Sequence, residues 1–308
     1  MNKVLFGDCR ETLKTIDVKA RMCVTSPPYY GLRDYGGEKN QIGQEDTPEE
    51  FINNLVDVFR SVRDVLTDDG TLWVNIGDSY YNYRPGKGQA LVKQTLSSTE
   101  RDQPQDCPRR GNKLEGLKEK DLIGIPWMLA FALRADGWYL RQDIIWHKPN
   151  PMPESVRDRC TKSHEYLFLL SKNRKYYYDN EAIKEPVKQD WGTRDRSQGK
   201  YHNEGTGLQP HSGLEKSYTK RNKRSVWSIT NKPYKGAHFA VFPPDLIEPC
   251  ILAGSEQGDV VLDPFMGSGT TAMVAKKYNR NYIGCELHED YASLQTDRID
   301  SVPQQLML

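Results

Sequence analysis

Apolar positions recur along this chain with two spacings, which together predict alternating strands and helices. Short, nearly continuous apolar runs predict buried strands at 3–6, 22–24, 71–76, 142–146, 165–170, 260–262 and 282–285. Apolar residues on one helical face, clearest within 51–66, predict helices at 51–66, 126–136, 244–253, 268–277 and 289–299. This alternation predicts an α/β fold with a doubly wound, mostly parallel sheet whose ligands lie at the carboxyl ends of the strands.

The first long helix carries start and stop signals of its own. Thr47 and Glu50 have the spacing of a capping box, and Pro48 is tolerated in a first helical turn, which needs no donor there. Asp69-Gly70 predicts the end of this helix before the strand at 71–76.

Two long polar stretches, about 80–120 and 172–225, interrupt the alternation. Loops of this length inside a compact domain are usually functional or disordered. Residues 172–224 hold 13 Lys and Arg against 7 Asp and Glu, a charge of +6 on a chain whose net charge is +1. A basic module on a mildly acidic body predicts a polyanionic partner, with a solvated surface loop as the alternative. The candidate phosphate-binding residues are Lys220, Arg221, Lys223 and Arg224.

Composition argues against membrane, secreted and metal-binding proteins. No apolar run reaches the length of a membrane span and the first residues contain no signal peptide, so we expect a soluble, cytoplasmic protein. The six cysteines include no Cys-x-x-Cys pair, which argues against a zinc site or a disulfide framework, and we expect no metal.

The turn after the strand at 22–24 reads Thr25-Ser26-Pro27-Pro28-Tyr29. Two prolines remove backbone donors and fix φ, which keeps the carbonyls of the turn available as acceptors. Ser26 adds a hydroxyl acceptor and Tyr29 a flat stacking surface. Such a turn can hold a planar base and accept hydrogen bonds from its exocyclic amine, although a proline-rich turn without a ligand is the plain alternative.

A second turn follows the strand at 260–262. Asp263 ends the strand, and Gly267-x-Gly269 before a helix brings backbone close to a ligand. The glycines and Glu286 also fit the relaxed pattern of a dinucleotide-binding protein, so a nicotinamide-dependent oxidoreductase is a rival interpretation. No Gly-Lys-Ser/Thr follows, which excludes a phosphate-binding P-loop.

Taken together, these two turns resemble the motifs of the amino-group DNA methyltransferases, which methylate cytosine N4 or adenine N6. The motif order, with the catalytic turn first, is similar to that of the group called beta. The resemblance implies S-adenosylmethionine as methyl donor and a Rossmann-like sheet. It assigns to the cofactor Asp8, Thr25, His238, Phe242, Pro243, Asp263, Pro264, Phe265, Gly267, Ser268, Gly269, Thr270, Thr271 and Glu286. Within this set Glu286 would bind the ribose and Asp8 would face the adenine, while His238 could instead be a capping or core residue.

The same resemblance gives the catalytic roles to Ser26, Pro27, Pro28 and Tyr29. Ser26 Oγ and the Pro27 carbonyl would accept hydrogen bonds from the amine, and Tyr29 would stack on a base flipped out of the duplex. Serine at position 26 favours cytosine N4 and leaves adenine N6 open. A DNA-binding protein without turnover is the alternative from another class. Cys250 follows a proline, as in cytosine-5 methyltransferases, but falls on the core face of the helix at 244–253.

The resemblance also implies how the chain is organised. Residues 1–171 would form the catalytic part of the core with a DNA-facing insertion at 80–120, 172–225 a target-recognition module, and 226–308 the cofactor-binding part. The expected partner is double-stranded DNA, with a cognate restriction endonuclease as a further candidate, and the chain would act as a monomer or homodimer. The two insertions match no pattern, so the recognition sequence stays open.

Overall fold

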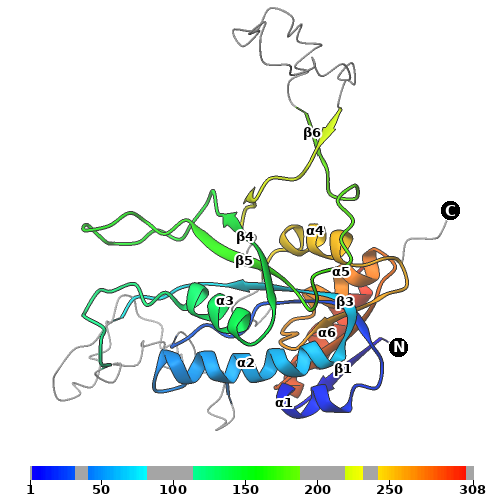
Figure 1. The fold of residues 1–308 in the computed structure, drawn as a ribbon, viewed down its shortest axis with the longest axis horizontal. Coiled ribbons are helices and arrows are strands. Elements are labelled where there is room, and N and C mark those ends of the chain that lie inside the picture. Colours follow the sequence, from blue (N-terminus) through cyan, green and yellow to red (C-terminus); the bar gives the residue numbers. More distant parts are fainter. Residues whose placement is uncertain (1, 32–40, 82–113, 188–218, 232–241, 303–308) are drawn as a thin grey trace, which may run out of the picture.

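The computed structural model describes residues 2–31, 41–81, 114–187, 219–231 and 242–302, and its centre is an eight-stranded sheet (Figure 1). The strands lie in the order β1 (Lys3–Phe6), β10 (Asn281–Glu286), β9 (Val260–Asp263), β2 (Ala20–Thr25), β3 (Leu66–Ile76), β5 (His164–Ser171), β4 (Tyr139–His147) and β8 (Val226–Ser228). Among these strands β5 alone runs opposite to the others. The predicted doubly wound, mostly parallel sheet is therefore confirmed.

Helices cover both faces of this sheet (Figure 1). The short α1 (Cys9–Thr12), α2 (Pro48–Val65) and α3 (Ile125–Ala135) share one apolar core with the inner side of β2 and β3. On the other face α4 (Pro244–Gly254) and α5 (Thr270–Lys277) pack around Trp73 and Val24, and α6 (Ala292–Asp300) joins them through Ile299. A 3-10 turn at Glu289–Tyr291 precedes α6, where the sequence predicts one continuous helix.

Helix α2 forms as its capping residues predict. Thr47 Oγ1 accepts a hydrogen bond from the Glu50 amide at 3.1 Å, and Phe51 and Phe59 are fully buried. Burying such a side chain contributes about 1.5–3 kcal/mol, so the apolar face holds the helix on the sheet.

The end of α2 differs from the expectation. It ends at Val65, and β3 begins at Leu66, which pairs with Ala20 of β2, so Asp69-Gly70 lies within the strand. A Cβ at Gly70 would approach the Thr67 carbonyl to 2.9 Å, so the glycine permits a close backbone approach there and does not end a helix.

The described ends of the segment 172–225 come together away from the large sheet. Strands β6 (Glu185–Pro186) and β7 (Lys220–Arg221) form an antiparallel pair, and β6 projects from the body in Figure 1. Neither these strands nor β8 was expected from the sequence, because two or three residues carry no periodicity. Residues 188–218 and most of 80–120 lie outside the described residues, and the three-part division of the chain stays a prediction. Within the described residues, no helix is long and apolar enough to cross a membrane.

Candidate active site

The carboxyl ends of β1, β2, β3, β9 and β10 meet at one edge of the sheet, beside the first residues of the antiparallel β5. A cavity of about 560 Å³ lies there. Its wall includes Gly7–Cys9, Ser26–Tyr29, Pro264–Ser268 and Glu286–His288, each of which directly follows or ends a strand. The volume falls within the roughly 300–1,000 Å³ range of small-molecule sites. The cavity therefore joins the two turns that the sequence singled out.

Asp263, at the end of β9, is a buried hub behind the cavity wall. Its carboxylate accepts hydrogen bonds from Thr25 Oγ1 at 2.6 Å, Thr271 Oγ1 at 2.6 Å and the Phe265 amide at 3.0 Å. Burial raises the pKa of this carboxyl to about 6, and the three donors partly oppose the rise. Because Thr25, Asp263 and Thr271 do not line the cavity, their contacts tie β2, β9 and α5 together behind it.

The glycine turn after Asp263 is shaped by backbone that only glycine adopts readily. Gly267 has a φ of +52°, and Gly269, with a φ of +83°, caps the first turn of α5 without a side chain. The Gln295 amide donates to the Gly267 carbonyl at 2.7 Å, which anchors the turn to α6. Of the predicted turn residues, the cavity wall includes Pro264, Phe265, Gly267, Ser268 and Thr270 but not Gly269.

Glu286 ends β10 and lies in the cavity wall. Its two carboxylate oxygens accept from the Gly267 amide at 2.8 Å and the His288 amide at 3.0 Å. Burial raises the pKa of Glu286, although these two amides lower it. The carboxylate thus fixes the glycine turn and still presents an acidic edge to a ligand.

His288 is a site residue that sequence reasoning missed. Its ring packs edge-on against Tyr291, and its Nε2 is buried without a hydrogen-bond partner among the described residues. An unpaired buried ring nitrogen in a cavity wall is a ready contact for a polar ligand. Its place two residues after the strand-ending acid is the signal that could have found it.

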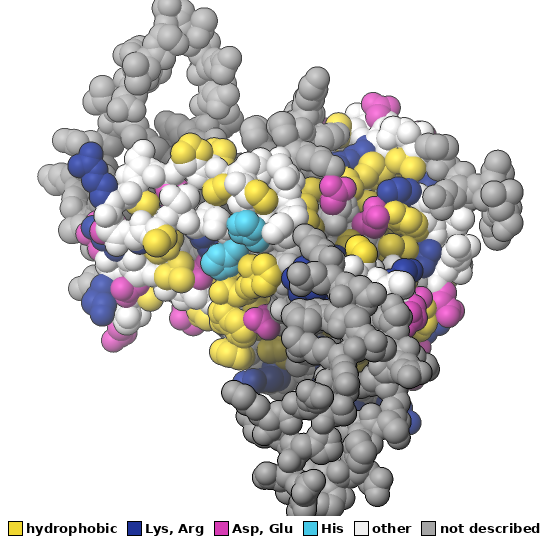
Figure 2. Space-filling view, turned by 90° about the horizontal axis from the view of Figure 1, so that it is seen from above, with side chains coloured by type: hydrophobic (Ala, Val, Ile, Leu, Met, Phe, Trp, Pro, Cys, Tyr) yellow, Lys and Arg dark blue, Asp and Glu magenta, His cyan; other side chains and the backbone are white. Residues whose placement is uncertain are grey.

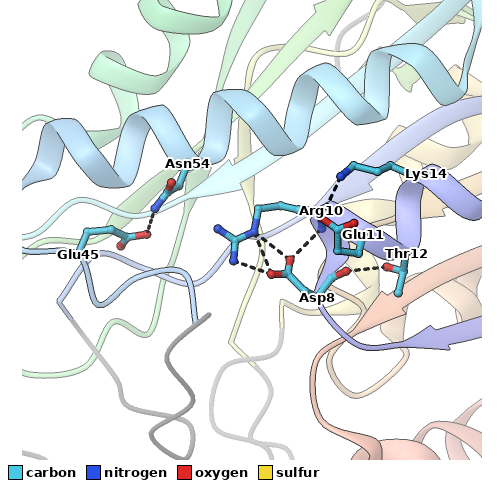
Figure 3. A network of polar contacts seen from close by, with 7 residues as sticks. All are labelled: Asp8, Arg10, Glu11, Thr12, Lys14, Glu45 and Asn54. Atoms are coloured by element: carbon cyan, nitrogen blue, oxygen red, sulfur yellow. Dashed lines mark hydrogen bonds and ion pairs between the residues drawn. The ribbon is translucent and has the colours of Figure 1, made fainter.

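Asp8 follows β1 in the cavity wall, and its carboxylate is engaged by a neighbour. It caps α1 and accepts from the Arg10 amide at 2.9 Å and from Arg10 Nη2 at 2.6 Å. Burial opposes ionisation, yet the hydrogen bonds to Arg10 outweigh it and lower the pKa of Asp8. Figure 3 shows the Arg10 guanidinium pointing at the Asp8 carboxylate, and a separate hydrogen bond from Asn54 of α2 to Glu45. Asp8 therefore stays ionised and oriented by Arg10.

The turn Ser26–Tyr29 forms another part of the cavity wall. Pro27 is buried, while Ser26, Pro28 and Tyr29 are half-buried and all four line the cavity. Among the described residues, no hydrogen bond reaches Ser26 Oγ or the Pro27 carbonyl. These two acceptors are available at the cavity wall, as the prolines predict.

The Tyr29 hydroxyl is held by residues on or next to β3, β4 and β5. It donates to Glu165 Oε2 at 2.7 Å, and Glu165 forms an ion pair with Lys148. Asn75 Nδ2 lies 3.4 Å from the same carboxylate oxygen. The sequence predicts a strand at 165–170 but gives no role to Lys148 or Glu165, because the contact between Glu165 and Tyr29 spans 136 positions.

The remaining predicted cofactor residues differ in their position relative to the cavity. Phe242 lines the cavity, Pro243 is the buried residue before α4, and His238 lies outside the described residues. Cys250 is buried within α4, where its thiol donates to the Leu246 carbonyl and burial raises its pKa, which confirms the core interpretation. Within the described part of the chain, no cluster of metal-ligating side chains is found.

The basic cluster of the segment 172–225 is partly neutralised within the chain. Arg221 and Arg224 both pair with Glu185, and Lys223 lies over the Trp227 ring at 4.9 Å. On the face shown in Figure 2, basic and acidic side chains lie interspersed. The described residues of that face therefore form no single basic field.

Comparison with known proteins places the chain in a family. A family model described as DNA methylase, covering the N6 and N4 enzymes, matches residues 20–297. The Type II methyltransferase M.SmaI of Serratia marcescens is 49% identical over 298 residues, 96% of this chain and 90% of that protein. The Type II methyltransferase M.Cfr9I of Citrobacter freundii is 47% identical over 294 residues, 95% of this chain and 86% of that protein.

Solved structures share the fold at lower identity. The cytosine-N4-specific PvuII DNA methyltransferase aligns with a TM-score of 0.63 and 17% identity, over 100% of this chain and 89% of that one. A putative DNA modification methylase of Thermus thermophilus, complexed with S-adenosyl-L-methionine, aligns with a TM-score of 0.60 and 24% identity, over 99% and 96%. Since the family model spans most of the sequence and relatives are nearly half identical along it, this chain belongs to the N6/N4 DNA methylases, which methylate an exocyclic amine of a DNA base with S-adenosylmethionine.

Proposed function

We propose that this enzyme methylates the N4 amine of cytosine, and that the turn Ser26–Tyr29 carries the reaction. The observation that supports this proposal is the pair of acceptors, Ser26 Oγ and the Pro27 carbonyl, left without partners among the described residues in the cavity wall. A neutral hydroxyl at position 26 favours cytosine, following the pattern of the N4 members that the sequence resembles. Adenine N6 is the second candidate, because both amines offer the same two hydrogens.

The residues on the other part of the cavity wall, here called the cofactor wall, fit S-adenosylmethionine. Glu286 presents a carboxylate suited to ribose hydroxyls, His288 Nε2 is a buried polar atom without a partner among the described residues, and Phe242 and Phe265 supply apolar walls for a purine. Gly267 is half-buried and has no side chain, so the methionine end can approach the turn closely there. Bound there, the cofactor supplies an electrophilic methyl group on a sulfonium.

The chain contributes position and polarity to the transfer. Hydrogen bonds from the amine to Ser26 Oγ and the Pro27 carbonyl favour a pyramidal nitrogen, whose lone pair is then free of the ring. With S-adenosylmethionine held by the cofactor wall, Ser26 Oγ and the Pro27 carbonyl would direct the amine nitrogen toward the methyl group, and the amine would lose one proton on transfer. Holding the reactants in line and hydrogen-bonding the amine is the contribution of this turn.

Contact with DNA is assigned to both insertions and to Lys220, Arg221, Lys223 and Arg224. Their support is the charge of +6 over 172–224 and the position of β7 at the base of that segment. A cognate restriction endonuclease is proposed from the Type II designation of the relatives. A cytoplasmic location follows from the DNA substrate, and a monomer or homodimer completes the proposal.

Transfer of tritiated methyl groups from S-adenosylmethionine to duplex DNA tests the activity. Nucleoside mass spectrometry of DNA from expressing cells identifies the base, and long-read sequencing of the same DNA gives the site. N4-methylcytosine is expected, and N6-methyladenine alone would overturn the choice of base but keep the mechanism. Specific DNA binding without transfer at saturating cofactor would favour a silent binding protein, and NADH binding in place of S-adenosylmethionine would favour the oxidoreductase.

A further inference from the structure

A half-buried ion pair stands in the cavity wall without a role in the mechanism so far. Lys148 follows β4 and Glu165 lies at the start of β5, and their side chains are only 16% and 14% exposed. A pair withdrawn from water in this way gains little stability, because desolvation offsets the attraction. Lys148 Nζ also lies 4.2 Å from the centre of the Trp146 ring. An ion pair that adds little stability and yet lines the cavity points to a use in the site.

The carboxylate of Glu165 is the point where several elements meet. It accepts from the Tyr29 hydroxyl at 2.7 Å, pairs with Lys148 and lies 3.4 Å from Asn75 Nδ2. Asn75 is itself fixed by a hydrogen bond to the Tyr166 carbonyl at 3.1 Å. Three side chains, one from β3, one from the residue after β4 and one from β5, thus lie around the Tyr29 hydroxyl.

The ring of Tyr29 is restrained on its flank as well. A Cβ placed on Gly77 would lie 2.6 Å from Tyr29 Cε2, so the ring packs directly against the backbone after β3. With its flank against Gly77 and its hydroxyl bonded to Glu165, the ring has one defined orientation. The neighbouring Tyr30 instead packs on Phe51 and donates to the Asp46 carbonyl at 3.3 Å.

We infer that Glu165 is a positioning residue for methyl transfer, which holds the Tyr29 ring in its stacking orientation through the phenolic hydroxyl, with Lys148 and Asn75 fixing the carboxylate. The inference rests on the proposed role of Tyr29 as the stacking surface for the flipped base. An aromatic ring that could rotate would place the base less accurately beside the methyl donor, and misplacement slows an in-line transfer. In this role Glu165 acts through Tyr29 and needs no contact of its own with substrate or cofactor.

The test is a double-mutant cycle on single-turnover methyl transfer to duplex DNA. Glu165→Gln and Tyr29→Phe each remove the charged hydrogen bond while keeping shape, and each should slow transfer by about tenfold or more. The combined variant should be about as slow as either one, because both changes break one contact. The dissociation constant of S-adenosylmethionine, measured by calorimetry, should change by less than about twofold, since the cofactor wall is untouched.

Two matched variants serve as controls. Tyr30→Phe removes a hydroxyl one position along, and Glu248→Gln removes a carboxylate paired with Lys277 on the far side of the sheet. Both should transfer at the wild-type rate. If Glu165→Gln folds poorly, as thermal melting would show, Tyr29→Phe alone decides.

Each adverse result has a distinct meaning. A wild-type rate in Tyr29→Phe or in folded Glu165→Gln overturns the inference and leaves the methyltransferase activity standing. Multiplying effects in the combined variant, or a loss of cofactor affinity equal to the loss of rate, also overturn it, because Glu165 would then act by another route. A wild-type enzyme that transfers no methyl group to any DNA overturns the proposed function itself.

Discussion

The two walls of the cavity differ in whether their oxygen acceptors already have hydrogen-bond partners within the chain. On the wall proposed to bind the cofactor, Asp8 and Glu286 accept hydrogen bonds from the chain's own donors, and Asp263 does so directly behind it. On the catalytic wall, the part formed by the turn Ser26–Tyr29 and proposed to carry the reaction, Ser26 Oγ and the Pro27 carbonyl have no hydrogen-bond partner among the described residues. The carboxylates of the first wall are therefore oriented without a ligand, whereas the two acceptors of the second wall can bond to the base.

We connect this difference with two proposed tasks, holding the cofactor and hydrogen-bonding the amine of the base. Carboxylates bonded within the protein hold the glycine turn and the strand ends in one geometry, which lowers the cost of ordering them around a cofactor. Acceptors without internal partners can instead follow a hydrogen-bonding amine as it becomes pyramidal. Substitutions on the two walls should therefore change different measurable quantities.

The largest effect is expected at the catalytic wall. Ser26→Ala removes one of the two amine acceptors and should lower kcat for methyl transfer by about 10²-fold, the usual cost of one preorganised polar contact in a transition state. Cofactor affinity should stay unchanged, which calorimetry would show. Ser61→Ala, whose hydroxyl bonds the Asp57 carbonyl on the exposed side of α2, is the matched control. If Ser26→Ala lost cofactor affinity as much as rate, the two walls would not have separate roles.

Glu286→Gln addresses the cofactor wall. The amide keeps one acceptor for the Gly267 or His288 amide but loses the second, so cofactor affinity should fall by about tenfold or more, the usual value of a charged hydrogen bond. Titration calorimetry with S-adenosylmethionine measures the change. Glu289→Gln, an exposed neighbour, should bind as the wild type does. Unchanged affinity in Glu286→Gln would remove Glu286 from the cofactor site.

Asp263→Asn should act on stability. The amide keeps one acceptor oxygen and loses the other, so the contact with Thr25 or Thr271 is lost and the free energy of unfolding should fall by about 1–3 kcal/mol. Because burial raises the folded pKa of Asp263 to about 6 from the usual 3.8, the folded state binds this proton more tightly. Wild-type stability from this group is present below about pH 4 and declines as pH rises toward 6. The difference between wild type and variant should therefore be larger at pH 4 than at pH 7.

Denaturant unfolding at both pH values measures this difference. Asp297→Asn on the exposed side of α6 controls for the loss of one carboxyl group. A difference that grows as pH rises would contradict the buried position of Asp263.

The smallest effect concerns the basic cluster. Lys220→Gln with Lys223→Gln should reduce the slope of log affinity for DNA against log salt by about 1.8, taking 0.9 for each phosphate contact. Arg221→Gln with Arg224→Gln should reduce it less, since Glu185 already engages both guanidinium groups. Filter binding over a range of salt measures both. Identical slopes in all three proteins would leave this segment a solvated surface.

Much of this structure could be read from the sequence, because the signals involved are local. The capping of α2 by Thr47 depends on neighbours three residues apart, and the buried strands show as short apolar runs. The two turns at Ser26 and Gly267 follow strands whose carboxyl ends must share one edge of a parallel sheet. Strand order then brings them together, and the sequence alone determined which turns would line the site.

Tertiary structure decided what local signals do not contain. The end of α2 at Val65 depends on the pairing of Leu66 with Ala20, which no window around Asp69-Gly70 reveals. The sequence predicts Asp263 as a cofactor contact, and only the structure places it behind the cavity wall with hydrogen bonds from Thr25 and Thr271. Glu165 reaches Tyr29 only because β5 runs antiparallel beside β3 and begins at the edge where the parallel strands end. Contacts of this kind depend on which strands become neighbours, and the burial of whole apolar faces sets that order.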